Sequence, residues 1–293
     1  MSGRVRTIRD LNQGNNRGQG LLPSGQGDNY PILNSNRFGG SPEEARKETF
    51  WQMLKFIFCP YFSIKSFVFI ITIIDILMYI VTVFYSYDTS EFLQPKLSTL
   101  ILFGAKDPEK MHGHEVWRWL TPSLLHLNLM HLCSNMVMQL ILGSRLEPTV
   151  GLWRTIVVYE VSGFGGVLFS SLVSDTIAVG ASTCLFGMLA SMIVWVIMNW
   201  SRLPDNPYRI FALVWLIMLL IFNIMMGVSS EHIDNWGHFG GLITGAGLGL
   251  ALFKYVGSEP ETRQQKITRY LGAGFVAFYF LLGIVLFYTV VKN

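Results

Sequence analysis

Seven long hydrophobic stretches follow one another along the chain after a polar N-terminal region. Each is about 17 to 25 residues long, enough to cross a hydrocarbon core of about 30 Å as an α-helix. They lie near residues 66–86, 120–142, 150–173, 179–200, 209–227, 235–255 and 270–290. The pattern predicts an all-α fold, a polytopic bundle of membrane-spanning helices.

The sequence outside these stretches divides the chain into four expected regions. Residues 1–48 are rich in Gly, Asn, Gln, Ser and Arg, and such a segment buries too little apolar area to offset its ordering entropy. We therefore expect a disordered cytoplasmic tail there. Residues 49–65 are aromatic and weakly basic, which is typical of a segment at the membrane interface. Six spans within 66–255 are expected to form a core, and 256–293 a linker and a seventh span.

Composition and charge support a membrane protein. Only 14% of the residues are charged and 51% are hydrophobic, which is far more apolar than a soluble domain of this size. The net charge of +3 gives no reason to expect a nucleic-acid partner. If each of the seven stretches crosses the membrane, 17 of the 22 lysines and arginines lie on the same side of the membrane as the N-terminus. This distribution predicts a cytoplasmic N-terminus and a lumenal or extracellular C-terminus, in the secretory pathway or the plasma membrane.

Polar residues inside three of the spans are the candidates for function, because polar groups are costly in lipid. In the second span His131 and Asn135 are four residues apart and share one helix face. His126 is about 140° away from His131 on a continuous helix, which indicates a different role. The fourth span opens with Ser182 and the sixth with His238. The long loop before the second span carries His112 and His114, which we expect to be solvated.

The second, fourth and sixth spans all run inward, so these residues share the outer half of the membrane. A serine hydroxyl is a poor nucleophile without an adjacent base, and His238 can accept the proton of Ser182. His131, Asn135 and the backbone N–H of Ser182 can donate to an oxyanion. Because no carboxylate is placed to complete a triad, the pattern predicts a Ser-His dyad for acyl transfer. This chemistry requires no metal and no organic cofactor.

Each feature also has a simpler explanation by itself. Ser182 is a small residue of the kind found where helices cross, and a single histidine such as His238 can serve packing or proton relay. The glycines at 241, 245 and 249 predict tight packing of the sixth span against the fourth. Cys184 is a conceivable nucleophile, although it points elsewhere on the helix than Ser182. A nucleophile, a base and anion donors at one depth together favour catalysis.

These motifs resemble those of the rhomboid family of intramembrane serine proteases. The serine motif of the family, usually glycine-x-serine-glycine, appears as Gly180-Ala181-Ser182-Thr183, and its histidine motif as His238-x-x-Gly241-x-x-x-Gly245. Further matches are the second-span signature His126, His131 and Asn135, the loop pair Trp117-Arg118, and Glu147-x-x-x-Gly151. The resemblance covers roughly residues 115–255. The seventh span resembles the six-plus-one architecture of eukaryotic secretory-pathway rhomboids, not the mitochondrial one-plus-six form.

The resemblance implies a six-span rhomboid protease core at 66–255 followed by a seventh transmembrane helix. It also implies that Ser182 is the nucleophile and His238 the base. The supporting roles that it implies are oxyanion donors (His131 and Asn135), a loop support (His126) and an aromatic ring packed on the histidine (Phe186). The chain departs from the family at Thr183, where a β-branched side chain replaces the usual glycine beside the nucleophile.

The sequence therefore predicts a serine endopeptidase that cleaves single-span transmembrane proteins within or near their membrane segment and releases their ectodomains. Its expected partners are those substrates and the lipid bilayer, with no nucleic acid and no metal. One alternative is a catalytically inactive rhomboid-like protein that binds membrane clients, although members of that class typically lack the serine or the histidine. Another is a seven-span receptor or transporter, against which the sequence shows no convincing internal repeat.

Overall fold

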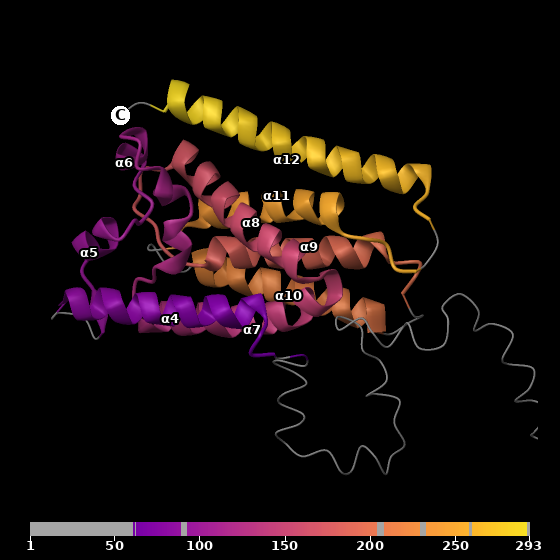
Figure 1. The fold of residues 1–293 in the computed structure, drawn as a ribbon, viewed down its shortest axis with the longest axis horizontal. Helices are drawn as coiled ribbons and strands as arrows, with labels where there is room; N and C mark the ends of the chain where they lie inside the picture. The colour runs from indigo at the N-terminus through magenta and orange to yellow at the C-terminus, as the bar shows by residue number, and fades with distance from the viewer. Residues whose placement is uncertain are drawn as a thin grey trace, which may run out of the picture.

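The structure is a computed structural model that describes residues 61, 63–88, 93–203, 208–228, 233–257 and 260–291. The expected tail at 1–48 and most of the expected interfacial segment at 49–65 lie outside the described residues. Within the described ranges the prediction of an all-α bundle is confirmed (Figure 1). The seven long helices are α4 (Phe67–Tyr85), α7 (Leu129–Val150), α8 (Leu152–Val173), α9 (Ser182–Met198), α10 (Tyr208–Val228), α11 (Asn235–Leu252) and α12 (Arg263–Thr289).

The connection between α4 and α7 contains the other regular elements of the described chain. Strands β1 (Tyr87–Asp88) and β2 (Gln94–Pro95) pair antiparallel. They are followed by the short helices α5 (Leu97–Leu102) and α6 (Pro108–His112) and the 3₁₀ turns η4 (Val116–Trp119) and η5 (Thr121–Leu124). Helices α7, α9 and α11 all begin at the end of the bundle where this connection lies (Figure 1). We call this the site end, defined by the helix starts Leu129, Ser182 and Asn235.

The helix of the second span begins later than the hydrophobic pattern predicts. Residues 121–124 form a 3₁₀ turn, and Asn128 has an extended backbone and caps α7 by accepting a hydrogen bond from the His131 N–H at 2.9 Å. An asparagine at this position satisfies a backbone donor that the first helical turn leaves free. The 140° separation of His126 and His131 is therefore wrong, because His126 precedes the helix.

The seventh helix also differs from its predicted bounds, beginning at Arg263 and not near residue 270. Thr262 and Gln265 form a reciprocal capping box at its start, which stabilises a helix terminus in a polar sequence. The Tyr279 hydroxyl donates to the Gly165 carbonyl of α8 at 2.7 Å. At the site end, Phe287 stacks on His112 with ring centroids 4.1 Å apart. His112 is thus packed, contrary to the prediction that it is solvated, whereas His114 is exposed.

Helix α11 lies between α8, α9 and α12, and its glycines allow close backbone contact. A Cβ atom on Gly241 would overlap the Thr183 carbonyl of α9, and one on Gly245 would overlap Gly187. Gly249 of α11 faces Ser191 of α9, and a Cβ atom on Gly249 would lie 3.2 Å from the Ser191 Cα. The predicted packing of the sixth span on the fourth is confirmed.

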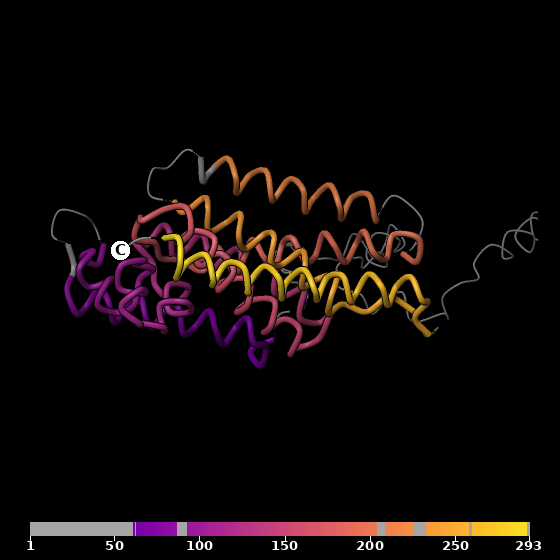
Figure 2. The backbone as a smooth tube through the Cα atoms, turned by 90° about the horizontal axis from the view of Figure 1, so that it is seen from above, coloured from indigo at the N-terminus to yellow at the C-terminus, as the bar shows by residue number. Residues whose placement is uncertain are grey.

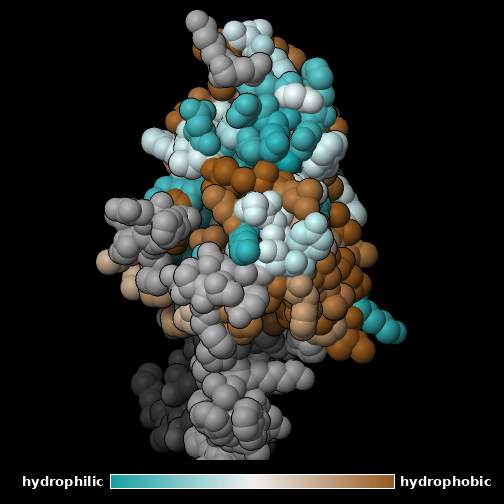
Figure 3. All heavy atoms as spheres, turned by 90° about the vertical axis from the view of Figure 1, so that its left-hand side faces the viewer, coloured by the Kyte–Doolittle hydropathy of each residue, from teal (hydrophilic) through white to brown (hydrophobic). Residues whose placement is uncertain are grey.

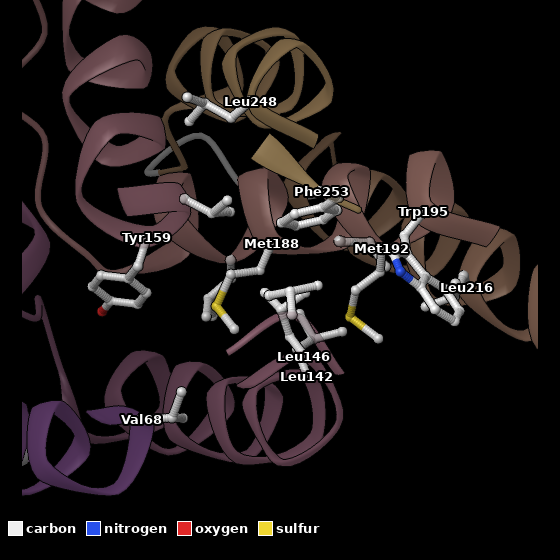
Figure 4. Packing of buried hydrophobic residues seen from close by; sticks show 14 of the residues in the cluster. Val68, Leu142, Leu146, Tyr159, Met188, Met192, Trp195, Leu216, Leu248 and Phe253 are labelled. Atoms are coloured by element: carbon white, nitrogen blue, oxygen red, sulfur yellow. The ribbon is translucent and has the colours of Figure 1, made fainter. Parts of the chain in front are cut away.

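A hydrophobic core joins the helices on both sides of α9. Its side chains come from α4, α7, α8, α9, α10 and α11 and from the segment after α11 (Figure 4); the labelled ones are Val68, Leu142, Leu146, Tyr159, Met188, Met192, Trp195, Leu216, Leu248 and Phe253. Seen from above, α10 lies at one edge of the bundle and α4 near the other (Figure 2).

Buried polar side chains add contacts between α4, α7 and α8. Gln139 donates to the Asp75 carboxylate at 3.0 Å and accepts from the Tyr159 hydroxyl at 2.8 Å. The Glu147 carboxylate accepts from the backbone N–H groups of Phe67 and Val68 at the start of α4. Negative charge at a helix N-terminus is favourable because the free N–H groups point toward it.

The exterior of the bundle is suited to lipid. Of the described helices, α4, α8 and α12 are long and apolar enough to cross a membrane, and Ser182–Met198 and Arg209–Met225 are shorter apolar helices. Large hydrophobic side chains are exposed along α4, α10 and α12. The site end, which faces the viewer in Figure 3, combines hydrophilic residues in its upper part with hydrophobic ones around them.

We expect Gly245→Ala to destabilise the protein, because the new methyl group would press on the backbone of Gly187. Overpacking of this kind costs about 1–3 kcal/mol of unfolding free energy, more than the helix propensity that alanine adds. The measurement is the thermal unfolding midpoint in detergent. Gly274→Ala on α12 is the matched control, since nothing lies within 4 Å of its added Cβ. Equal midpoints for the two variants would contradict the packing argument.

Candidate active site

Ser182 and His238 lie side by side at the site end. The Ser182 Oγ and the His238 Nε2 are 2.7 Å apart. Ser182 is the first residue of α9, and His238 lies in the first turn of α11. Asp234 begins α11 as its N-cap and accepts from the Gly237 N–H at 2.9 Å. Two helix starts therefore place a hydroxyl within hydrogen-bonding distance of an imidazole.

The rest of the His238 ring is held by packing. Phe186, one turn after Ser182 on α9, stacks on the imidazole with ring centroids 4.2 Å apart and an interplanar angle of 15°. The Nδ1 atom of His238 is buried, and it has no hydrogen-bond partner among the described residues. The carboxylate of Asp234 serves the helix terminus. The arrangement within the described chain is a pair of residues, Ser182 and His238, oriented by an aromatic ring.

Hydrogen-bond donors gather around Gly180, two residues before Ser182. Gly180 has a φ of +129°, a conformation that glycine adopts easily. A Cβ atom there would lie 2.8 Å from the His131 Nε2 and 3.4 Å from the Asn135 Nδ2. The Nδ2 of Asn135 is buried and donates to no group in the described part of the chain. The structure thus brings the first turns of α7 to the segment that leads into Ser182.

His126 lies on the loop before α7 and is fully buried. Its ring meets that of His131 edge-on, with centroids 5.4 Å apart. Neither of its ring nitrogens has a hydrogen-bond partner among the residues described. His126 therefore contacts another candidate residue.

Thr183 fits beside Ser182 because neighbouring helices carry glycine where its side chain packs. A Cβ on Gly166 of α8 would lie 2.8 Å from the Thr183 Cβ, and one on Gly237 of α11 would lie 2.9 Å from its Cγ2. Thr183 is itself buried. The β-branched side chain thus occupies space that α8 and α11 leave open, and it does not displace α11.

A cavity of about 910 Å³ opens at the site end. Its lining comes from α5, from the loop and first turn of α7 including Asn128 and His131, and from the segments that precede α9 and α11. Both polar and apolar residues line it. Among the candidate residues, the lining includes His131 but not Ser182 or His238.

The loop between α4 and α7 is stabilised by Arg118, which the sequence singled out only by resemblance. Arg118 is buried and donates to the carbonyls of Ile101 and Ala105 at 2.8 and 2.7 Å. It also donates to the Glu115 carboxylate at 2.7 Å. By donating to these carbonyls, the guanidinium fixes η4 against the end of α5 and the residues that follow it.

Comparison with known proteins agrees with this geometry. Residues 113–255 match the family described as the rhomboid domain. Rhomboid-like protease 1 of Toxoplasma gondii is 32% identical over 228 residues, which cover 77% of this chain and 75% of that protein. The chain belongs to the rhomboid family. Rhomboid-like protease 2 of the same organism is 28% identical over 257 residues, 85% of each chain. RHOMBOID-like protein 1 of Arabidopsis thaliana is 39% identical over 160 residues, 54% of this chain and 40% of its own length.

Membership of the rhomboid family and the apolar helices together make the chain an integral membrane protein. The shared segment contains Ser182, His238, His131 and Asn135. The names of the two Toxoplasma relatives describe proteases.

We expect Gly180→Ala to disrupt the arrangement of His131 and Ser182 in this candidate site. The alanine methyl would lie 2.7 Å from the His131 Cε1, and its φ of +129° is strained for any residue with a Cβ, at a cost of about 1–3 kcal/mol. The turnover of a transmembrane reporter in detergent should fall by at least about tenfold, while Gly274→Ala leaves it unchanged. Wild-type turnover in Gly180→Ala would show that the spacing at Gly180 does not matter.

Proposed function

We propose that this rhomboid is an intramembrane serine endopeptidase that cleaves single-span transmembrane proteins within or near their membrane segment. The observation that carries the proposal is the 2.7 Å contact between the Ser182 Oγ and the His238 Nε2. An adjacent base is what a serine hydroxyl needs to become a nucleophile. The buried Asn135 amide and the His131 ring, both beside Gly180, support the second requirement of acyl transfer, a place for the oxyanion.

In the proposed reaction the Ser182 Oγ attacks the scissile carbonyl carbon while the His238 Nε2 takes the hydroxyl proton. The carbonyl oxygen becomes an oxyanion that accepts hydrogen bonds from the Asn135 amide, the His131 ring and the Ser182 backbone N–H. That N–H is available because the first N–H groups of a helix have no partner within it. His238 then gives the proton to the leaving amine, and an acyl-serine remains.

Water completes the proposed cycle. His238 accepts a proton from a water molecule that attacks the acyl carbonyl, and a second oxyanion forms in the same place. When it collapses, the proton returns to the Ser182 Oγ and the new carboxyl terminus leaves. Phe186 keeps the imidazole in one orientation through both steps by stacking on it. The cavity beside His131 supports entry of water and of an extended peptide.

The membrane setting limits which substrates fit. In lipid, a helical backbone keeps its carbonyls bonded internally, so a scissile carbonyl must first leave its helical hydrogen bond. Substrates with small or helix-destabilising residues near the outer end of their span therefore suit the proposed enzyme. With the N-terminus cytoplasmic, as the lysine and arginine distribution favours, the site end faces the lumen or the cell exterior. Cleavage there releases ectodomains.

The proposal makes Ser182 and His238 indispensable. Ser182→Ala removes the nucleophile and His238→Ala the base, so each should abolish cleavage of a transmembrane reporter by purified protein in detergent or liposomes. Losses of at least about 10³-fold are expected from removal of either member of such a pair. Cleavage is followed by the appearance of the two reporter fragments.

Ser191→Ala is the matched control for Ser182→Ala, because Ser191 is buried on the same helix and donates only to the Met188 carbonyl. It should retain wild-type cleavage. Full activity of Ser182→Ala would refute the proposed mechanism. Inactivity of the folded wild-type protein toward every reporter tested would instead favour the client-binding alternative.

Asn135→Ala tests the oxyanion donor separately. Loss of one such donor lowers kcat by about 10- to 1000-fold, and KM should change little because the oxyanion exists only in the transition state. Steady-state kinetics with the same reporter measure both constants. Asn223→Ala on α10, whose amide donates to the Leu219 carbonyl, is the control with unchanged kcat. An unchanged kcat in Asn135→Ala would remove this residue from the site.

A further inference from the structure

Lys106 occupies an unusual position for a lysine. It lies on the loop between α5 and α6, and its side chain is fully buried. Lysine is almost never fully buried unless its ammonium group is paired. Its Nζ donates to the Ser170 hydroxyl at 2.7 Å and to the Ser174 carbonyl at 3.0 Å. Both contacts lie at the end of α8 that faces the site end.

The main chain of Lys106 contacts the segment that leads to Ser182. Lys106 and Ala178 form an antiparallel β-bridge, with N–H to carbonyl distances of 2.9 and 3.3 Å in the two directions. Ala178 precedes Ser182 by four residues. Between them, the Gly180 N–H donates to the Pro122 carbonyl at 2.8 Å. The start of α9 is therefore attached to the loop that carries Lys106.

The side chain of Lys106 contacts the start of α11 through one intermediate. The Ser170 hydroxyl, which accepts from Lys106, donates to the Asp234 Oδ1 at 2.7 Å. The same oxygen accepts from the Gly237 N–H, and the Asp234 carbonyl accepts from the His238 N–H at 3.0 Å. A continuous path of hydrogen bonds thus runs from Lys106 to the backbone of the residue that carries the imidazole.

Opposite charges at Lys106 and Asp234 favour this path of hydrogen bonds. Burial lowers the pKa of the Lys106 ammonium, whereas the carboxylates of Asp234 and Asp175 act in the opposite direction. A buried cation is tolerated when it is paired and its hydrogen bonds are satisfied. The Asp234 carboxylate is stabilised by the Ser170 hydroxyl and by the free N–H groups at the start of α11.

We propose that Lys106 is a positioning residue that fixes the start of α9 relative to the start of α11, and so keeps Ser182 in contact with His238. The backbone of Lys106 binds the segment that leads to Ser182. Its ammonium group is linked through Ser170 and Asp234 to the start of α11, which carries His238. Lys106 touches neither Ser182 nor His238 in its hydrogen bonds and acts only through these intermediates. The inference rests on the proposed function of the two residues.

Two matched pairs of variants test the proposal in the full-length protein, reconstituted in liposomes with a transmembrane reporter. Ser170→Ala breaks the path at its middle, and Ser171→Ala is its control, because Ser171 is buried on the same helix and its hydroxyl contacts only the Met111 sulfur at 3.8 Å. Lys106→Met removes the ammonium group but keeps the length of the side chain. Lys110→Met, at an exposed position of the following helix α6, is its control.

We expect Ser170→Ala and Lys106→Met to lower kcat by about tenfold with KM within about twofold of wild type, because misalignment of reacting groups acts on the chemical step. Both controls should keep the wild-type kcat. In Lys106→Met combined with Asp234→Asn, the loss in kcat should be smaller than the product of the two single losses, since both changes interrupt one path. A purely structural role would lower the unfolding midpoint and leave the kcat of the folded protein unchanged.

Wild-type kcat in Ser170→Ala, or multiplicative losses in the double variant, would overturn the role of Lys106. Ser182→Ala is measured in the same assay, and its inactivity keeps this outcome separate from a failure of the proposed function. If Lys106→Met does not fold, Ser170→Ala still decides, because it removes one hydroxyl and leaves both charges in place.

Discussion

The close approach of α9 and α11 is the constraint on which the rest of the structure depends. Gly241 and Gly245 bring the backbone of α11 against Thr183 and Gly187 of α9, in places where a single methyl group would overlap the facing atoms. Two helices in backbone contact have little freedom to slide or rotate, because a packed interface resists deformation. Their first turns are therefore held at one level, and the Ser182 hydroxyl and the His238 imidazole meet there at 2.7 Å.

The same close packing buries a polar group at a cost in free energy. A buried donor without an acceptor costs free energy of about 1–3 kcal/mol, and the Asn135 Nδ2 is such a donor within the described chain. In the proposed mechanism, this free donor is pre-organised for the oxyanion, a charge that forms only during the reaction. The hydrophobic exterior of α4, α10 and α12 and the core in Figure 4 hold this polar group inside a lipid-facing bundle.

Much of the architecture was predictable because lipid imposes length and polarity on each span. The seven stretches, the glycine face of α11 and the shared level of Ser182 and His238 follow from hydrophobic runs and helical spacing. The start of α7 could not be predicted in this way, because Asn128 and the 3₁₀ turn at 121–124 interrupt a continuous apolar run. The sequence wrongly predicted a solvated His112 and gave no signal for the burial of Lys106. The reason is that their partners, Phe287 and Ser170, are distant in sequence. The family resemblance identified Phe186 for the stacking that the structure shows.

The most direct test of the account is to identify the residue that a serine-reactive fluorophosphonate modifies, by peptide mass spectrometry of the folded protein. The reagent forms a stable bond with a hydroxyl only when an adjacent base activates it. Contact between α9 and α11 predicts one adduct, on Ser182, which disappears in His238→Ala. An adduct on another residue such as Cys184, or equal modification of Ser182 with and without the imidazole, would contradict the account.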